Sequence, residues 1–75
     1  MNLTAITYLD DLPSGGKMFT ASCPELDIAS QGDTRPEALA NLRESVQGFL
    51  EAAEDEEVER RLRSGASVSA LEVAA

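Results

Sequence analysis

Residues 19–50, FTASCPELDIASQGDTRPEALANLRESVQGFL, contain more mutually consistent local signals than any other part of this chain. A β-prone run over 17–23 ends at Pro24, because proline cannot donate to a strand ladder. A shorter β-prone run follows over 26–31. The sequence therefore predicts two strands, over 17–23 and 26–31, joined by a Cys-Pro turn.

A helix start comes next in the same stretch. Thr34 and Glu37 have the spacing of a capping box, in which each side chain accepts from the other residue's amide. Pro36 falls in the first turn, where its missing N–H costs nothing. Apolar residues then recur at helical spacing as one stripe: Leu39, Leu42, Val46, Phe49 and Leu50. We expect an amphipathic helix over 34–53 that packs on one face of the sheet.

The N-terminal part predicts one more strand. Residues 3–9 are rich in β-branched and aromatic side chains. Residues 10–16 combine acids, a proline and two glycines, which is typical of a chain reversal. Three strands with short connections form an antiparallel meander.

The composition changes after Glu54, where an acidic run is followed by Arg60–Arg63. An acidic patch beside a basic one is one interpretation. A short helix over 55–63 is the other, because its opposite charges lie four residues apart: Glu56–Arg60, Glu57–Arg61 and Glu59–Arg63. Gly65 would be its C′ residue. One helix over 34–63 would measure roughly 45 Å, far longer than a seven-residue strand of about 23 Å, so a break near 53–55 is expected.

Residues 67–73, SVSALEV, are β-capable and can return to the sheet as a fourth strand. A right-handed crossover would place this strand parallel to the first, in the order 3-2-1-4. The fold class is then α+β, with the helices on one sheet face. The other face would keep Ile6, Tyr8 and Met18 uncovered, which predicts a homodimer or a complex. Pairing through an edge strand is the alternative route to the same association.

Composition limits the classes of function. The 75 residues predict one domain over 1–75, and 14 acidic against 6 basic residues produce a net charge of −8. Such a surface disfavours direct nucleic-acid binding and suits a basic partner, although acid can also serve solubility alone. The N-terminus lacks a signal-peptide pattern, and no apolar run reaches the ~20 residues of a membrane span. We expect a soluble cytoplasmic protein.

The chain offers little catalytic chemistry. It has no histidine, so Cys23 lacks the usual base for nucleophilic catalysis and is expected to be a small buried residue. The carboxylate pairs Asp10–Asp11 and Glu25–Asp27 could hold Mg²⁺ or act as acid and base. They occupy turns, however, where acids are expected for conformational reasons. No catalytic, cofactor or metal site is predicted, and the chain is not expected to be an enzyme.

Three segments support a family resemblance. The runs ASCPEL (21–26), SQGDT (30–34) and EALANLRE (37–44) resemble the HicB-like antitoxin family, as do Gly15-Gly16 and Phe19 before them. The resemblance covers about residues 3–73. It implies a partial RNase H-like fold with the order β-β-β-α-β.

The resemblance also implies a function, which is to bind and neutralise a small mRNA-cleaving HicA-type toxin. Many members carry a C-terminal DNA-binding domain; this sequence contains none, so autoregulation through DNA is not expected. An acidic surface would cover the toxin's basic RNA-binding face, and the predicted partner-binding residues are the acids of the turns: Asp10, Asp11, Glu25 and Asp27. The alternative is a stand-alone homodimeric module with a regulatory or ligand-binding role and no toxin.

Overall fold

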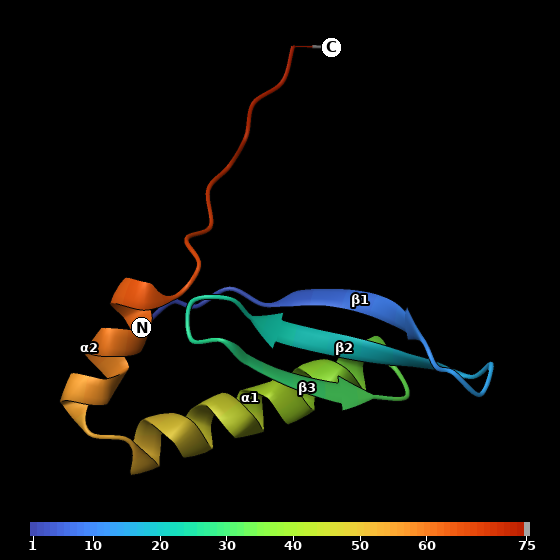
Figure 1. The fold of residues 1–75 in the computed structure, drawn as a ribbon, viewed down its shortest axis with the longest axis horizontal. Helices are drawn as coiled ribbons and strands as arrows, with labels where there is room; N and C mark the ends of the chain where they lie inside the picture. The colour runs from blue at the N-terminus through green and yellow to red at the C-terminus, as the bar shows by residue number, and fades with distance from the viewer. Residues whose placement is uncertain (75) are drawn as a thin grey trace.

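The computed structural model describes residues 1–74 and has an α+β fold (Figure 1). Its elements, in chain order, are β1 (Ile6–Asp11), β2 (Lys17–Cys23), β3 (Ile28–Gly32), α1 (Arg35–Ala52) and α2 (Asp55–Ser64). The strands form one antiparallel sheet in the order β1-β2-β3. The predicted meander is therefore confirmed.

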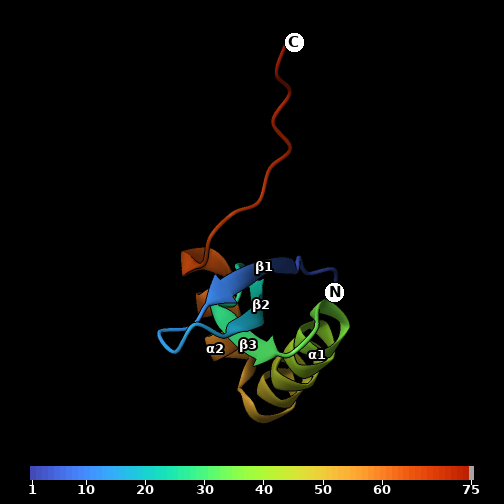
Figure 2. The ribbon, with the colours of Figure 1, turned by 90° about the vertical axis from the view of Figure 1, so that its right-hand side faces the viewer.

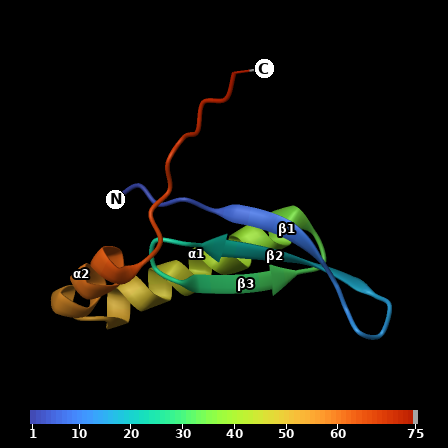
Figure 3. The same cartoon turned by 45° about the horizontal axis from the view of Figure 1, so that its top comes forward.

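The register of the sheet sorts the side chains into two faces. Thr7 lies opposite Ala21, and Ala21 lies opposite Ser30, so these three residues share a face. α1 packs beneath this face, mainly against β3 and β2 and only slightly against β1 (Figure 3). The opposite face carries Ile6 and Tyr8 and has no helix over it (Figure 2).

The end of α1 agrees with the local sequence signals, and its start contains one of the two bonds of the predicted capping box; within residues 1–74 the Thr34 amide does not donate to the Glu37 side chain. Thr34 is the N-cap, and its hydroxyl accepts a hydrogen bond of 3.2 Å from the amide of Glu37. The helix ends at Ala52, and the N–H of Ala53 donates to the carbonyl of Phe49. A new helix begins at Asp55. The expected helix over 34–53 and the expected break after it are both present.

The core is small and lies between α1 and the sheet. Its buried residues are Ala21, Cys23, Leu26, Ala38 and Leu42. Gly32 allows the end of β3 to approach the start of α1, since an added Cβ would lie 2.6 Å from the Ala38 nitrogen. Leu26, expected in a strand, instead fills the core from a turn.

Two strand boundaries differ from the prediction, and each has a local cause. β1 covers Ile6–Asp11 rather than 3–9, because the Thr4 amide donates to the Glu25 carboxylate and not to a strand. β3 covers Ile28–Gly32 rather than 26–31, because residues 24–27 form a turn. Asp27 closes that turn in the left-handed region, with a φ of 56°.

Residues 67–73 do not form a fourth strand in the described chain. The predicted order 3-2-1-4 is therefore correct for the three strands of the meander and wrong for the fourth. The amide of Ala66 donates to the Pro24 carbonyl at the end of β2, and the segment then extends beyond β1 (Figures 1 and 2). Because α1 lies under β3 and β2, a strand outside β1 would have little helix surface to pack on.

α2 also departs from the expected arrangement. It lies at the end of the sheet beside the β2–β3 turn and does not cover a sheet face (Figure 1). Arg61 explains this position. Its guanidinium donates to the Leu26 carbonyl at 3.1 Å and stacks 4.5 Å from the centre of the Phe49 ring. The second helix is therefore attached through one arginine that reaches both the turn and α1.

Candidate partner-binding surfaces

The four acids predicted to bind a partner lie in two separate places. Asp10 and Asp11 are at the end of β1, beside the β1–β2 connection. Glu25 and Asp27 are in the β2–β3 turn, at the opposite end of β2. Seven residues of strand separate the two pairs, about 23 Å at the usual rise. They cannot form one continuous acidic patch.

Glu25 is occupied by contacts within the chain. Both of its carboxylate oxygens accept from the Thr4 amide, at 3.2 and 3.0 Å, and Oε1 also accepts from the Cys23 thiol at 3.7 Å. Hydrogen bonding by Thr4 lowers the pKa of Glu25 below its ordinary value of 4.5. This carboxylate holds the N-terminal segment on the turn.

Cys23 is a core residue, as expected, with 1% of its surface exposed. Burial raises the pKa of its thiol above the ordinary value of 9.0. A neutral, buried thiol is a poor nucleophile, because the thiolate is the reactive form.

The other three turn acids differ in availability. Asp10 accepts a hydrogen bond from the Thr20 hydroxyl and is half-buried. Asp11 is exposed and lies across the sheet from Lys17. Asp27 is exposed too, so Asp11 and Asp27 are the two that remain accessible.

A larger group of carboxylates lies at the junction of α1 and α2. We call it the acidic ridge; its members are exposed and comprise Glu51, Glu54, Asp55, Glu56 and Glu59. Within residues 1–74, the ion pairs of this region join Glu57 to Arg60 and Arg61, at 3.8 and 3.9 Å. Of the three predicted pairs, only Glu57–Arg61 is present. Glu57 is not part of the ridge, so no arginine neutralises the ridge carboxylates within residues 1–74. The acidic run signalled this site, but its i,i+4 spacing favoured a purely helical role.

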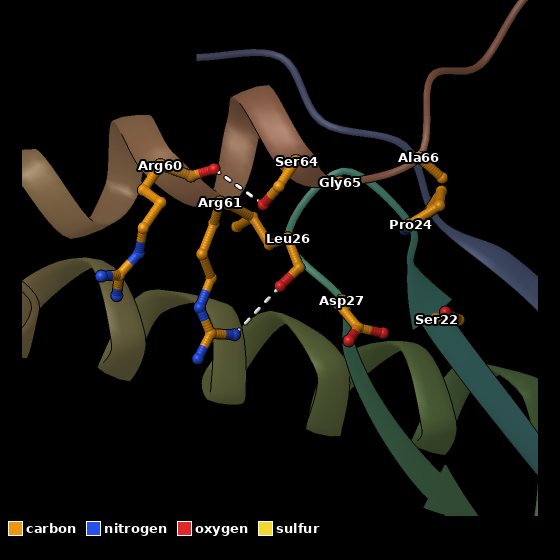
Figure 4. A pocket seen from close by; sticks show the side chains of 9 residues that line it. All are labelled: Ser22, Pro24, Leu26, Asp27, Arg60, Arg61, Ser64, Gly65 and Ala66. Carbon is orange, nitrogen blue, oxygen red and sulfur yellow. Dashed lines mark hydrogen bonds between the residues drawn. The ribbon is translucent and has the colours of Figure 1, made fainter.

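A cavity of about 570 Å³ lies between α2 and the β2–β3 turn (Figure 4). Arg60 and Arg61 line it on the helix side, and Asp27 lines it on the turn side. Arg61 already donates to Leu26, and the Asp27 carboxylate opposes any bound anion. This cavity is best explained as the seam that attaches α2 to the turn.

An apolar groove of about 540 Å³ lies between the N-terminal segment and α1. Much of its wall is hydrophobic, formed by Leu3 and Ala5 on one side and by Leu39, Val46 and Leu50 on the other. Ile6 and Tyr8 are each 45% exposed on the uncovered face of the sheet nearby. Leu9, on the helix-side face of β1, is also 45% exposed, so the β1 edge has exposed apolar side chains on both faces.

Residues 1–74 contain no group of three or more acidic, cysteine or histidine side chains that could hold a metal ion. No helix in this part of the chain is both long and apolar enough to cross a membrane.

Protein-family models, curated proteins and solved structures produce no significant match to this chain. Its function has to be inferred from its residues and from the surfaces described above.

Proposed function

We propose that this chain is a cytoplasmic, antitoxin-like protein that binds and neutralises a small, basic, mRNA-cleaving toxin of the HicA type. It acts by covering the toxin's RNA-binding surface, without a cofactor or a catalytic activity of its own. We further propose that it is a homodimer, and that its fold is a partial RNase H-like one whose fourth strand comes from residues 67–73.

The acidic ridge is the observation that carries this proposal. Its carboxylates are exposed at the junction of two helices, in a chain with a net charge of −8. An RNA-cleaving toxin needs a basic surface to hold phosphates. A ridge of carboxylates can occupy that surface by charge complementarity and exclude RNA from it. The ridge therefore replaces the four turn acids as the main proposed contact.

The arrangement of the elements agrees with the proposal. A three-stranded antiparallel meander followed by α1 is the β-β-β-α part of the order that the family resemblance implies. The segment that would supply the last strand is present in the chain but lies outside the sheet.

The test is direct binding to a small, basic, histidine-containing protein encoded beside this chain. We expect co-purification, binding at micromolar concentration or tighter, and loss of the growth arrest that the toxin causes. Failure of the two proteins to bind at micromolar concentration would contradict the proposal.

A matched pair of charge reversals locates the contact. Glu54→Lys with Glu56→Lys reverses the charge of two of the five carboxylates in the acidic ridge and should weaken toxin binding at least tenfold. Asp11→Lys with Asp33→Lys changes the charge equally at exposed positions outside the ridge and should have a much smaller effect. Equal losses from both pairs would show that net charge, not the ridge, determines binding.

The second candidate function is a stand-alone homodimeric regulatory or ligand-binding module without a toxin. The exposed Ile6 and Tyr8 on the uncovered sheet face favour association of some kind. Sedimentation across the micromolar range tests it: a dimer that does not bind the neighbouring protein supports this candidate. An 8.0 kDa species throughout that range would exclude the dimer.

A further inference from the structure

This chain contains an unpaired strand edge and an extended segment, which could hydrogen-bond to each other. One is the outer edge of β1, which borders no strand within residues 1–74. The other is the segment 67–73, called the tail below, which is extended and bonded to no strand. An unpaired strand edge presents a row of free amides and carbonyls to any extended chain that approaches it.

The tail has the length and the side-chain pattern of a strand for this edge. Seven residues span about 23 Å, compared with about 20 Å for the six residues of β1. Leu71 and Val73 would lie on one face of such a strand, and Val68 on the other. All three are exposed now, Leu71 at 86% and Val73 at 76%.

The surroundings of the β1 edge match this pattern. On the helix side of the sheet, Leu9 of β1 is 45% exposed and would border Leu71 and Val73. The apolar groove begins just before β1, beside residues 1–5. On the other side, the exposed Ile6 and Tyr8 would border Val68. Strand addition at this edge would thus cover apolar groups on both faces.

The root of the tail determines where the tail can go. The Gly65 amide donates to Arg61 at 2.7 Å, and the Ala66 amide donates to Pro24 at 3.2 Å. Gly65 is pressed against the turn, since a Cβ there would lie 2.2 Å from the Glu25 carbonyl oxygen. These contacts fix the start of the tail, and the tail then extends past β1 and away from its own sheet (Figures 1 and 2).

We propose that the tail pairs with β1 of a second copy, so that two copies exchange tails in a symmetric dimer. Each copy offers an unpaired β1 edge and an unpaired tail, and a two-fold axis pairs both tails with the β1 edges at once. This inference rests on the proposed homodimer and specifies its interface; it is independent of any toxin.

The experiment uses two single-cysteine proteins, each carrying Cys23→Ala. One carries Ser69→Cys in the tail, and the other carries Ala5→Cys before β1 and is labelled with ¹⁵N. After mixing and treatment with a short bismaleimide, we expect a cross-linked pair of one labelled and one unlabelled chain by mass spectrometry. A link between these two proteins can only join different copies.

Two controls separate failure of the exchange from failure of the dimer. A protein carrying both new cysteines that cross-links only within one chain would overturn the exchange, because the tail would then lie on its own β1. A sedimenting dimer whose mixed chains do not cross-link would also overturn the exchange, while leaving the dimer intact. A monomer throughout would overturn both.

A second pair of variants needs no cysteine and keeps Cys23. Ser69→Pro prevents the tail from donating to a ladder, whereas Ser69→Thr favours a strand. Since residue 69 is exposed and outside every element, neither change should unfold the chain. We expect Ser69→Pro to raise the dimer's Kd at least tenfold and Ser69→Thr to leave it unchanged or lower it. Because one of two adjacent amides must face the β1 edge, equal Kd values for the original chain, Ser69→Pro and the matching Ala70→Pro would contradict the exchange.

Discussion

Gly65 links α2 to the tail. A glycine is needed here because the β2–β3 turn lies very close, and not because the backbone conformation requires it. Its φ of −72° is open to any residue, but an added Cβ would lie 2.2 Å from the Glu25 carbonyl oxygen. We predict that Gly65→Ala lowers the free energy of unfolding by about 1–3 kcal/mol, the usual range for overpacking. Urea denaturation measures it.

Gly48 is the matched control for that substitution. It lies in the interior of α1, where an added Cβ would meet no atom within 4 Å. Gly48→Ala should therefore raise the free energy of unfolding by roughly 0.5–1 kcal/mol, because alanine favours the helix and restricts the unfolded chain. If both substitutions had the same sign, the close contact at Gly65 would not be the cause.

Glu25 predicts a dependence of stability on acid pH. Hydrogen bonding by Thr4 lowers its pKa in the folded state, so the folded chain favours the ionised carboxylate. The stabilisation is present above the ordinary value of 4.5 and is lost as the pH falls through the lower folded-state pKa. Thermal unfolding followed by circular dichroism should show this loss. In Glu25→Gln, the midpoint of thermal unfolding should change less over the same pH range. An unchanged profile for Glu25→Gln would contradict the assignment.

At the scale of elements, Arg61 fixes the position of α2 together with the backbone contacts of Gly65 and Ala66 at the turn. Arg61 joins it to Leu26 and Phe49, whereas Arg63 is exposed and only approaches the Glu59 carbonyl at 3.5 Å. We predict that Arg61→Ala destabilises α2 by about 1–2 kcal/mol, from one lost cation–π contact and one lost hydrogen bond. Hydrogen exchange should then accelerate in α2 and not in β2.

Two further variants test whether the geometry of Arg61 matters. Arg63→Ala removes the same kind of side chain two residues further along, on the opposite side of α2, and should leave exchange in α2 nearly unchanged. Arg61→Lys keeps the charge but loses the planar group that stacks on Phe49, so it should resemble Arg61→Ala. Full retention of protection by Arg61→Lys would show that charge alone attaches the helix.

At the scale of the whole molecule, the net charge of −8 on 75 residues opposes folding through self-repulsion. Salt screens exposed charges, so the midpoint of thermal unfolding should rise between low and physiological ionic strength. Glu54→Gln with Glu56→Gln removes two charges from the acidic ridge and should reduce that rise. Binding to the proposed toxin should respond in the opposite direction and weaken with salt. A midpoint that does not change with salt would show that self-repulsion is negligible.

The sequence by itself determined the elements whose signals are local. The cap at Thr34, the helix that follows it, the break before α2 and the strand over Lys17–Cys23 all lie where short-range patterns placed them. Each depends on interactions between residues a few positions apart, such as the bond from Glu37 to Thr34.

Only the tertiary structure decided which polar side chains bond within the chain and which remain exposed to a partner. Glu25 contacts Thr4 across 21 positions, and Arg61 contacts Leu26 across 35. Such contacts leave no periodic trace in the sequence, because they depend on how separate elements pack. These contacts engage Glu25 within the chain, place α2 at the end of the sheet, and leave both the acidic ridge and the 67–73 tail exposed.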